Sequence, residues 1–564
     1  MPAEPEWIRY DPDEETIRRL CAGLSCTEVV ARILVNRGIT DPTRASRFID
    51  ATVDELHPAA ALPHIAEATQ RLQTAVDAHD TICVYADRDI DGIAGAATLV
   101  QLLGTLGADV VPYVPGKWEG YGFSTESIEE LATAGVDLLI SVDCGTTAAE
   151  PIATAQEKGL DVVVTDHHQP DETDLPSIPL VNPQLSDSTY PNEHLAGGAV
   201  AMKVGEALLD RTHTIAQSDY YKYALPLAAL ATLGDYARLT LENRAIVWAG
   251  LDRLNSCGLS GLQRTAEHTG VASPQDLSWS LIPLLNAAQE DESGTLMLDL
   301  LLGSETEEID RQINLLETYR EERKAARAAR QAHLEECLHE QLEPHEEAML
   351  LVETDRWVGG VPARRLSERW GKPVITYRQK GEAYVGGGRT DQDVDLFGLV
   401  QACGDHLEDY WGHPGAPGFR ASKTELDSLC SCLTEELQRR YDEEDLRPRL
   451  EIDTTISTDD LTEDLVESIG ALEPFGHGLA QPVFLVEDVD IESVGLFGSE
   501  YEHVRFEPAD DAGVSIRHWG GKQQAMGLAA PLRAHLVGQV AWDDYRDVPA
   551  LDVQDYAIRS ESGQ

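Results

Sequence analysis

Short apolar runs rich in Val and Ile alternate with helix-like segments between residues 81 and 168. Such short, β-branched runs are typical of buried strands. Alternation at this spacing indicates βαβ units in a mostly parallel sheet. The pattern predicts strands at 81–85, 108–115, 136–145 and 160–168, and helices at 93–103, 124–135 and 147–159.

Three further stretches extend the prediction beyond this sheet. Residues 223–239 form an apolar, helix-like stretch that Asp235 interrupts. Residues 307–343 contain strong helix formers and neither Gly nor Pro, so they predict one continuous helix of roughly 50 Å. From about residue 448, β-branched and alternating runs predict a separate β domain.

Acid or histidine follows three of the predicted strands. If these strands lie side by side, the polar side chains meet at one edge of the sheet. Carboxylates and imidazole are ligands for Mn²⁺, Mg²⁺ or Zn²⁺, and crowded carboxylates need cations to neutralise them. Two cations roughly 3.5–4 Å apart suit phosphodiester cleavage, because they stabilise both the attacking and the leaving oxygen. The residues are Asp87, Asp89, Asp91, Asp143, Asp166, His167 and His168.

A calcium loop at residues 87–92 and an exposed polar turn at His167 and His168 are the alternatives to a metal site of this kind. Residues 87–92 spell D-x-D-x-D-G, the start of a calcium loop, but the twelfth position is Thr98 and a strand precedes the loop. A calcium loop is therefore excluded. An exposed polar turn is the alternative for His167 and His168, and their place at the end of a Val-Val-Val strand argues against it. The similar run at 391–395 follows a glycine run, so we expect a solvated turn entering a helix.

Acidic residues are spread along the whole chain. The 564 residues include 99 Asp and Glu against 44 Lys and Arg, for a net charge of −55. An even spread of this kind predicts adaptation to a salt-rich cytoplasm, as in a halophile, where salt screens the repulsion. The total charge argues against a nucleic-acid partner, but local patches count more than the sum.

The charge trend reverses in two segments. Seven basic residues gather between Arg364 and Arg389, and four more recur at helical spacing from Arg320 to Arg330. The first cluster predicts a phosphate-binding surface, with ordinary surface arginines as the alternative. The second predicts a basic helix face that lines a channel, with pairing to local glutamates as the alternative.

Cysteine spacing and hydropathy bear on the compartment. Nine scattered cysteines without a CxxC pair predict reduced thiols, with neither a zinc ribbon nor a disulfide framework. No apolar run of about 18 residues appears, and the first ten residues lack a signal region. We therefore expect a cytoplasmic protein without a membrane partner.

Four motifs together resemble those of the DHH phosphoesterases, and the longer pattern is similar to the RecJ-type single-strand-specific exonucleases. The motifs are D-R-D-I-D-G (87–92), S-V-D-C-G (141–145), T-D-H-H (165–168) and L-G-D-Y-A (233–237). The resemblance implies two ions, Mn²⁺ or Mg²⁺, held by Asp89, Asp91, Asp143, His167 and Asp235. It places Asp87 and His168 alongside as catalytic residues, and Asp166 behind an imidazole that it orients.

The resemblance runs nearly end to end and implies an α/β fold in four parts. These are a parallel-sheet DHH catalytic domain with N-terminal helices (1–305), a connecting helix (306–343), a smaller α/β DHH-associated domain (344–445) and an OB-like β-barrel (446–564). The implied substrate is single-stranded DNA, or RNA, cut in the 5′→3′ direction during repair, recombination or replication alongside other proteins of those processes. The implied nucleic-acid contacts are Lys117, Tyr121, Arg364, Arg389, Gly412 and His413.

Several positions depart from the family pattern. Gln289 and Glu290 stand where the family has Gly-Arg, Lys117 replaces an arginine, and Trp411 replaces a glycine before Gly412. These changes leave polarity and substrate preference open. The alternatives are a phosphodiesterase for short oligonucleotides or cyclic dinucleotides and a catalytically silent replisome scaffold. The complete set of motif carboxylates argues against the scaffold. Whether the β domain binds a strand also stays open.

Overall fold

The structure is a computed structural model that describes two compact units. The larger unit comprises residues 12–320 and 463–482, and the smaller unit comprises the rest of the chain. The described residues are 5–559 except 118, 120, 121, 172, 174, 345, 346, 391, 443, 511 and 512. No helix among these residues is long and apolar enough to cross a membrane.

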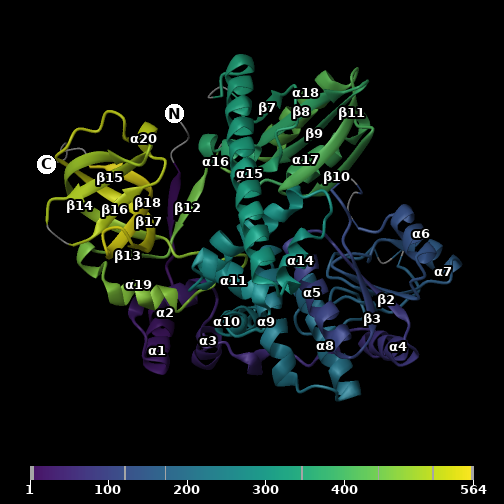
Figure 1. The fold of residues 1–564 in the computed structure, drawn as a ribbon. Coiled ribbons are helices and arrows are strands. Elements are labelled where there is room, and N and C mark those ends of the chain that lie inside the picture. The colour runs from purple at the N-terminus through teal and green to yellow at the C-terminus, as the bar shows by residue number, and fades with distance from the viewer. Residues whose placement is uncertain are drawn as a thin grey trace. The chain divides into compact units, whose positions relative to one another are not determined.

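The larger unit contains a five-stranded parallel sheet, as the alternating pattern predicts (Figure 1). Its strand order is β3-β2-β4-β5-β6, so β2 and β4 lie side by side with β5 next to β4. The carboxyl ends of these three strands, from which the predicted metal ligands follow, therefore meet at one edge. The strands are β2 (Thr81–Ala86), β3 (Asp109–Tyr113), β4 (Leu138–Val142), β5 (Asp161–Thr165) and β6 (Leu180–Val181).

Helices cover both faces of this sheet because successive strand residues point to opposite sides. Ile82 and Val84 pack into the core with α4, α5, α8 and α9, whereas Cys83 and Tyr85 pack against α6 and α7. The predicted helices at 93–103, 124–135 and 147–159 correspond to α5, α6 and α7. The helices named here are α4 (Ile65–Ala78), α5 (Ile90–Thr105), α6 (Thr125–Thr133), α7 (Ala149–Glu157), α8 (Gly197–Thr212) and α9 (Gln217–Gly234).

Small residues bring α5 unusually close to its neighbours. A Cβ atom at Gly95 would lie 2.6 Å from Val142 Cγ1 and 2.7 Å from Gly198 Cα. Only glycine fits where a sheet residue and the start of α8 approach the helix this closely. The first turn of α5 is thereby placed against the N-terminus of α8, and that contact shapes the site described below.

The remaining helices of the larger unit surround this core. A distant segment, residues 463–482, returns to it, and Arg244 on α10 holds the segment in place. The fully buried guanidinium donates to the carbonyls of Leu472 (3.0 Å), Glu473 (2.9 Å) and Pro474 (3.2 Å). The helices are α1 (Glu14–Leu24), α2 (Glu28–Asn36), α3 (Pro42–Ile49), α10 (Leu241–Leu254), α11 (Ser260–Thr269), α12 (Pro274–Asp276), η3 (Leu277–Leu281), α13 (Ile282–Leu285), η4 (Asn286–Glu290), α14 (Leu296–Leu302) and α19 (Glu463–Gly470).

The predicted long helix is continuous. Helix α15 spans Thr306–Gln341, and its first half packs into the larger unit while Leu334 and Leu338 pack into the smaller one. Two of its basic residues pair with glutamates on the same helix, which was the alternative to a basic face lining a channel. Arg320 lies 2.6 Å from Glu317, and Lys324 lies 4.0 Å from Glu321.

A second five-stranded sheet, of order β10-β11-β9-β8-β7, begins the smaller unit. Only the β7–β8 pair is parallel. Asp395 caps α17 by accepting a hydrogen bond from the Gly398 amide at 2.8 Å, so the run at 392–395 enters a helix as expected. The elements are β7 (Leu350–Glu353), α16 (Gly360–Trp370), β8 (Val374–Lys380), β9 (Ala383–Arg389), α17 (Leu396–Ala402), β10 (Asp409–His413), β11 (Ala416–Ser422) and α18 (Leu426–Arg440).

One cysteine pair contradicts the prediction of reduced thiols. Cys403, at the end of α17, and Cys432, on α18, form a disulfide. The two helices pack together against the same sheet. This brings the Cα atoms of the two cysteines to 6.0 Å from each other, although 29 positions separate them in sequence. Sequence spacing gave no sign of this pair, because the packing of α17 against α18 creates it.

The C-terminal strands close into a barrel, as the resemblance implied. They run in the order β13-β14-β15-β16-β18-β17, and β14 also pairs with β17. Next to this barrel along the chain, β12 pairs in parallel with β1. The elements are β1 (Glu6–Arg9), β12 (Arg449–Ile452), β13 (Thr454–Ile456), β14 (Phe484–Phe497), β15 (His503–Pro508), β16 (Ser515–His518), α20 (Lys522–Ala525), β17 (Leu532–Asp543) and β18 (Val548–Ile558).

We expect Arg244→Met to destabilise the larger unit by about 3 kcal/mol, because each buried carbonyl left without a donor costs about 1–3 kcal/mol. Urea unfolding in molar KCl measures the loss. Arg253→Met on the same helix is the control: its guanidinium is partly exposed and donates to Ala249 O at 2.8 Å, so it should cost less than about 1 kcal/mol. Equal losses in the two variants would mean that the returning segment does not depend on Arg244.

Candidate metal centre

The loop after β2 is built so that its carboxylates face the sheet edge. Asp89 caps α5, and its Oδ1 accepts hydrogen bonds from the amides of Asp91 (2.9 Å) and Gly92 (3.3 Å). A Cβ atom at Gly92 would lie 2.5 Å from the carbonyl oxygen of Asp87, so this turn requires glycine. Asp87, Asp89 and Asp91 thus leave the strand within a single tight turn.

Asp91 is fully buried and is held by the start of another helix. Its two carboxylate oxygens accept hydrogen bonds from the amides of Gly197 (2.8 Å) and Gly198 (2.6 Å) at the N-terminus of α8. A helix N-terminus favours a negative charge, which lowers the cost of burying this carboxylate. Sequence analysis did not identify this contact, although the Gly-Gly pair before the apolar run of α8 is a signal for it.

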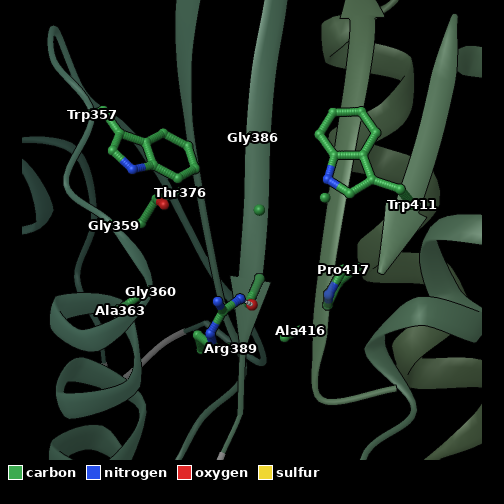
Figure 2. A pocket seen from close by; sticks show the side chains of 13 residues that line it. Trp357, Gly359, Gly360, Ala363, Thr376, Gly386, Arg389, Trp411, Ala416 and Pro417 are labelled. Carbon is green, nitrogen blue, oxygen red and sulfur yellow. Dashed lines mark hydrogen bonds between the residues drawn. The ribbon is translucent and has the colours of Figure 1, made fainter. Parts of the chain in front are cut away.

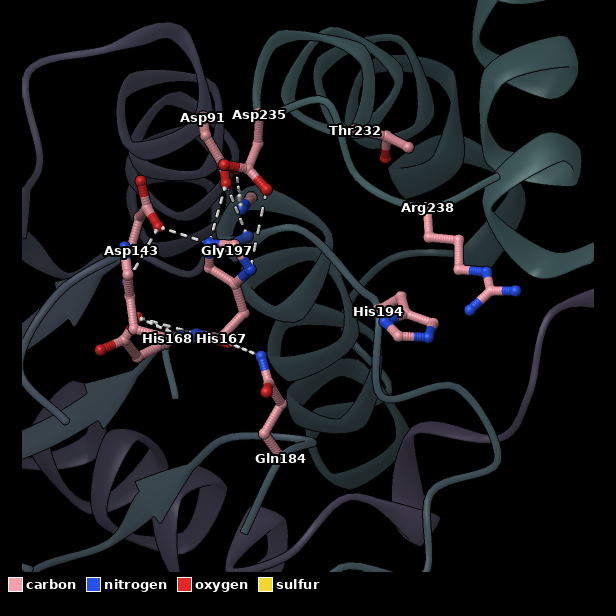
Figure 3. Close-up of polar contacts among 12 residues, drawn as sticks. Asp91, Asp143, His167, His168, Gln184, His194, Gly197, Thr232, Asp235 and Arg238 are labelled. Atoms are coloured by element: carbon pink, nitrogen blue, oxygen red, sulfur yellow. Dashed lines mark hydrogen bonds and ion pairs between the residues drawn. The ribbon is translucent and has the colours of Figure 1, made fainter. Parts of the chain in front are cut away.

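The other predicted metal ligands converge on His167 (Figure 3). Asp143 follows β4 in a left-handed conformation, with φ of 63°, which Asp tolerates better than most residues. Its Oδ1 lies 3.1 Å from His167 Nε2, and Asp91 Oδ2 lies 3.6 Å from the same nitrogen. Asp235, directly after α9, places Oδ2 3.8 Å from His167 Nδ1. The five predicted ligands therefore occupy one site.

Three overlapping groups in this site have ligand atoms within 4.8 Å of one another. In addition, Asp87 Oδ1, Asp143 Oδ1 and His167 Nε2 are buried without a hydrogen-bond partner among the described residues. Buried polar atoms of this kind normally have partners. Carboxylate and imidazole donors left unsatisfied around one point fit divalent cations of the Mn²⁺ or Mg²⁺ class. The groups are Asp87–Asp89–Asp143, Asp91–His167–Asp235 and Asp143–His167–His168.

The electrostatics of the site agree with this fit. Burial raises the pKa of Asp87 to about 6, and the neighbouring charge of Asp89 adds to the shift. Burial and the nearby carboxylates also raise the pKa values of Asp91 and Asp143. Without a cation, the site therefore disfavours the ionised carboxylates that a metal would require.

Asp166 faces away from these ligands and orients His168. Its Oδ1 accepts from His168 Nδ1 at 2.8 Å, and its Oδ2 accepts from the Thr146 amide at 2.9 Å. Burial opposes ionisation of Asp166, but these hydrogen bonds outweigh it and hold its pKa at about 2. The same bond raises the pKa of His168 to about 9. Asp166 thus fixes the orientation of the His168 ring at the rim of the site.

Two amide side chains support the histidines from behind, and sequence analysis did not assign them a role. Asn182 Nδ2 donates to His168 O at 2.8 Å and to Thr146 Oγ1 at 3.0 Å. Gln184 Nε2 donates to His167 O. Both residues belong to the V-N-P-Q stretch at 181–184, which follows β6.

Lys117 forms an ion pair with Glu290, one of the two residues that differ from the family pattern at 289–290. Its Nζ is 2.7 Å from Glu290 Oε2. The preceding residue, Gln289, accepts a hydrogen bond from Arg88 at 2.6 Å through its carbonyl oxygen, so this segment packs against the first motif. Lys117 is therefore partly neutralised. Tyr121, the other contact expected here, lies outside the described residues.

In the smaller unit, Arg389 lines a pocket of about 150 Å³ with Trp357 and Trp411 (Figure 2). The two indole rings lie on either side of β9 at Gly386, and Arg389 lies near the end of that strand. The Arg389 guanidinium packs against Gly360, at the start of α16. Burial and the proximity of Arg364 lower the pKa of Arg389.

The other nucleic-acid contacts predicted in this unit lie near that pocket. Arg364 is exposed and lies 3.0 Å from Glu368 on the same helix. Gly412 and His413 follow Trp411 on the exposed strand β10, where Gly412 has φ of 113° next to Ala416. The structure therefore brings Arg364 and Arg389 together and leaves Gly412 and His413 on β10, which β11 separates from the strand of Arg389.

Comparisons with known proteins cover nearly the whole chain. The N-terminal domain of the DHH family matches residues 81–234, and the RecJ OB domain matches residues 452–554. The single-stranded-DNA-specific exonuclease RecJ of Bacillus subtilis is 28% identical over 573 residues, covering 99% of this chain and 71% of its own length. RecJ of Thermus thermophilus is 30% identical over 510 residues, with 88% and 72% covered. A crystal structure of RecJ from Thermus thermophilus in complex with Mn²⁺ has a TM-score of 0.80 at 25% identity, covering 99% of this chain and 80% of that one.

We expect Asp235→Asn to weaken Mn²⁺ binding by at least about tenfold, because even residues behind metal ligands contribute about 10–100-fold to affinity. The metal-free variant should be as stable as the unaltered protein or more so, since one charge is removed from a crowded group. Calorimetric titration of metal-free protein measures the affinity, and thermal unfolding measures the stability. Asp219→Asn, at an exposed position on α9, the helix that precedes Asp235, is the control. Unchanged Mn²⁺ affinity in Asp235→Asn would exclude this carboxylate as a ligand.

Proposed function

The chain belongs to the RecJ family of single-stranded-DNA-specific exonucleases, and we propose that its metal centre hydrolyses terminal phosphodiester bonds of single-stranded DNA. The observation that carries this proposal is the convergence of five carboxylates with His167, in which three buried ligand atoms have no hydrogen-bond partner among the described residues. Such a centre suits an anionic substrate that brings its own oxygen ligands.

We assign the residues as follows. Asp89, Asp91, Asp143, His167 and Asp235 would hold two Mn²⁺ or Mg²⁺ ions. When bound, such a pair activates water and stabilises the charge that develops on the phosphate. His168, whose ring is oriented by Asp166 at 2.8 Å, is suited to donate a hydrogen bond to a phosphate oxygen. Asp87, whose buried Oδ1 has no hydrogen-bond partner among the described residues, is suited to accept a proton from the attacking water.

The pocket of the smaller unit is suited to hold the strand. Trp357 and Trp411 offer exposed aromatic faces, and bases stack on such faces whatever their sequence. Arg389 adds a cation for a phosphate, and Gly386, Gly387 and Gly388 line the same pocket without side chains that would reach far into it. In a chain with a net charge of −55, this local positive surface is what makes nucleic-acid binding electrostatically feasible. Contacts with replication or repair proteins and a cytoplasmic location belong to the same proposal.

End-labelled single strands test the activity. We expect the unaltered protein to shorten them with Mn²⁺ in molar KCl, and Asp91→Ala to be inactive, because Asp91 belongs to a ligand group and anchors it to α8. Early release of a 5′ label would establish the 5′→3′ polarity that the resemblance implies. Asp77→Ala, an exposed position on α4, should retain activity. If the unaltered protein binds strands but cuts neither DNA nor RNA, the proposed function is wrong.

We expect Arg389→Ala to weaken binding of single-stranded DNA. The plot of log K against log [KCl] should become shallower, with a slope less negative by about 0.7, because one phosphate contact is lost. Fluorescence anisotropy over a KCl series measures both quantities. Mn²⁺ affinity should not change, since Arg389 belongs to a different unit from the ligands. Arg420→Ala, which removes an exposed arginine paired with Glu408 on the same sheet, is the control. A slope equal to that of the unaltered protein would remove Arg389 from the phosphate contacts.

A further inference from the structure

A pocket of about 250 Å³ adjoins the metal centre, and none of the assignments above uses it. Thr232 and Leu233 on one side of Asp235, and Tyr236 and Ala237 on the other, belong to its wall. The segment that carries a predicted metal ligand therefore also builds the pocket. The remaining wall comes from Trp279 and from Phe475 and His477 of the returning segment.

Two unusual backbone conformations place aromatic rings in this pocket. Tyr236 has a left-handed φ of 56°, which is costly for a bulky residue, and its side chain is 66% exposed. Trp279 lies on the π-helical turn η3, in which the Ile282 amide bonds to Leu277 O, and is 75% exposed. Rare conformations of both kinds concentrate at functional sites. Here both present large rings to solvent at the same place.

The rings offer flat faces of a size that suits one planar ligand. Tyr236 and His477 stack almost in parallel, with centroids 5.9 Å apart and an interplanar angle of 5°. The pocket volume is below the roughly 300–1,000 Å³ of sites for drug-sized ligands, so it fits a single ring system. Aromatic walls with few polar groups favour stacking over hydrogen-bonded recognition.

Positive charge lies beside these rings. Arg238 is exposed and packs against Gly478, next to His477, and its guanidinium forms no ion pair within the described parts of the chain. Figure 3 shows Arg238 and His194 in the neighbourhood of Asp235. Burial lowers the pKa of His194, and the proximity of Arg238 and His477 lowers it further. A free arginine in so acidic a protein suits an anionic ligand that also carries a ring.

We propose that the pocket formed by Tyr236, Trp279, Phe475 and His477 is a stacking subsite for a nucleobase of the single-stranded substrate, with Arg238 available to its phosphate. The proposal rests on the proposed function and deepens it. A strand held at the metal centre necessarily presents bases close to Asp235, and these rings adjoin that residue. Because every base has an aromatic face, the subsite should accept all four bases with little preference.

Strands with one abasic residue at successive positions from the end test the subsite. We expect Trp279→Ala to lower kcat/KM for the intact strand roughly 5- to 100-fold, the range of base–aromatic stacking. In the unaltered enzyme, removing the base at one position should lower kcat/KM by a similar factor. In Trp279→Ala the same abasic strand should lower kcat/KM little, because the stacking contact is already absent. Trp279→Phe should restore most of the activity. Val111→Ala, which shortens an exposed apolar side chain on β3 of the same unit, should behave like the unaltered enzyme.

A general structural defect would give a different result, because it lowers kcat/KM equally for intact and abasic strands. Abasic penalties that are the same in Trp279→Ala and the unaltered enzyme at every position would therefore overturn the subsite. So would unchanged kcat/KM in Trp279→Ala, which would instead favour a protein partner for these exposed rings. If the unaltered enzyme degrades no strand at all, the proposed function itself fails, and that outcome is distinct from the other two.

Discussion

Repulsion among buried carboxylates is the constraint on which the larger unit depends. Asp91 and Asp143 are buried side by side with Asp87, and burial together with like charge opposes their ionisation. The fold holds them by parallel strand ends, by the capping turn of α5 and by the amides of Gly197 and Gly198. These restraints are made of backbone, which side-chain repulsion cannot displace. The result is a preorganised set of oxygen and nitrogen donors whose repulsion a divalent cation relieves.

The chain combines this acidic centre with a surface that is also acidic. Among the cations discussed above, Arg364 and Arg389 lie by the tryptophan-lined pocket, others lie in the middle of α15, and Arg238 lies near Asp235. The net charge of the molecule does not attract a polyanionic substrate. Local cations such as these are therefore needed to bind it. That the even spread of acidic residues is an adaptation to high salt stays a prediction.

Sequence patterns predicted the parts of the fold that follow from local regularity. Strand–helix alternation predicted the parallel sheet, the absence of Gly and Pro predicted α15, and polar residues after apolar strands predicted which side chains converge. Contacts between distant segments were not predictable in this way. The amides of Gly197 and Gly198 at Asp91, and the pairing of Lys117 with Glu290, depend on how helices and loops pack. The Cys403–Cys432 disulfide was missed for the same reason.

The larger unit is discontinuous in sequence, and this affects the order in which it is made. Residues 463–482 complete it through Arg244, and they supply Phe475 and His477 to the wall beside Asp235. A ribosome delivers this segment only after the long helix and the whole second sheet. A nascent chain that ends before this segment therefore lacks one wall of the pocket. Assembly of the complete pocket is thus deferred until the long helix and the second sheet have been translated.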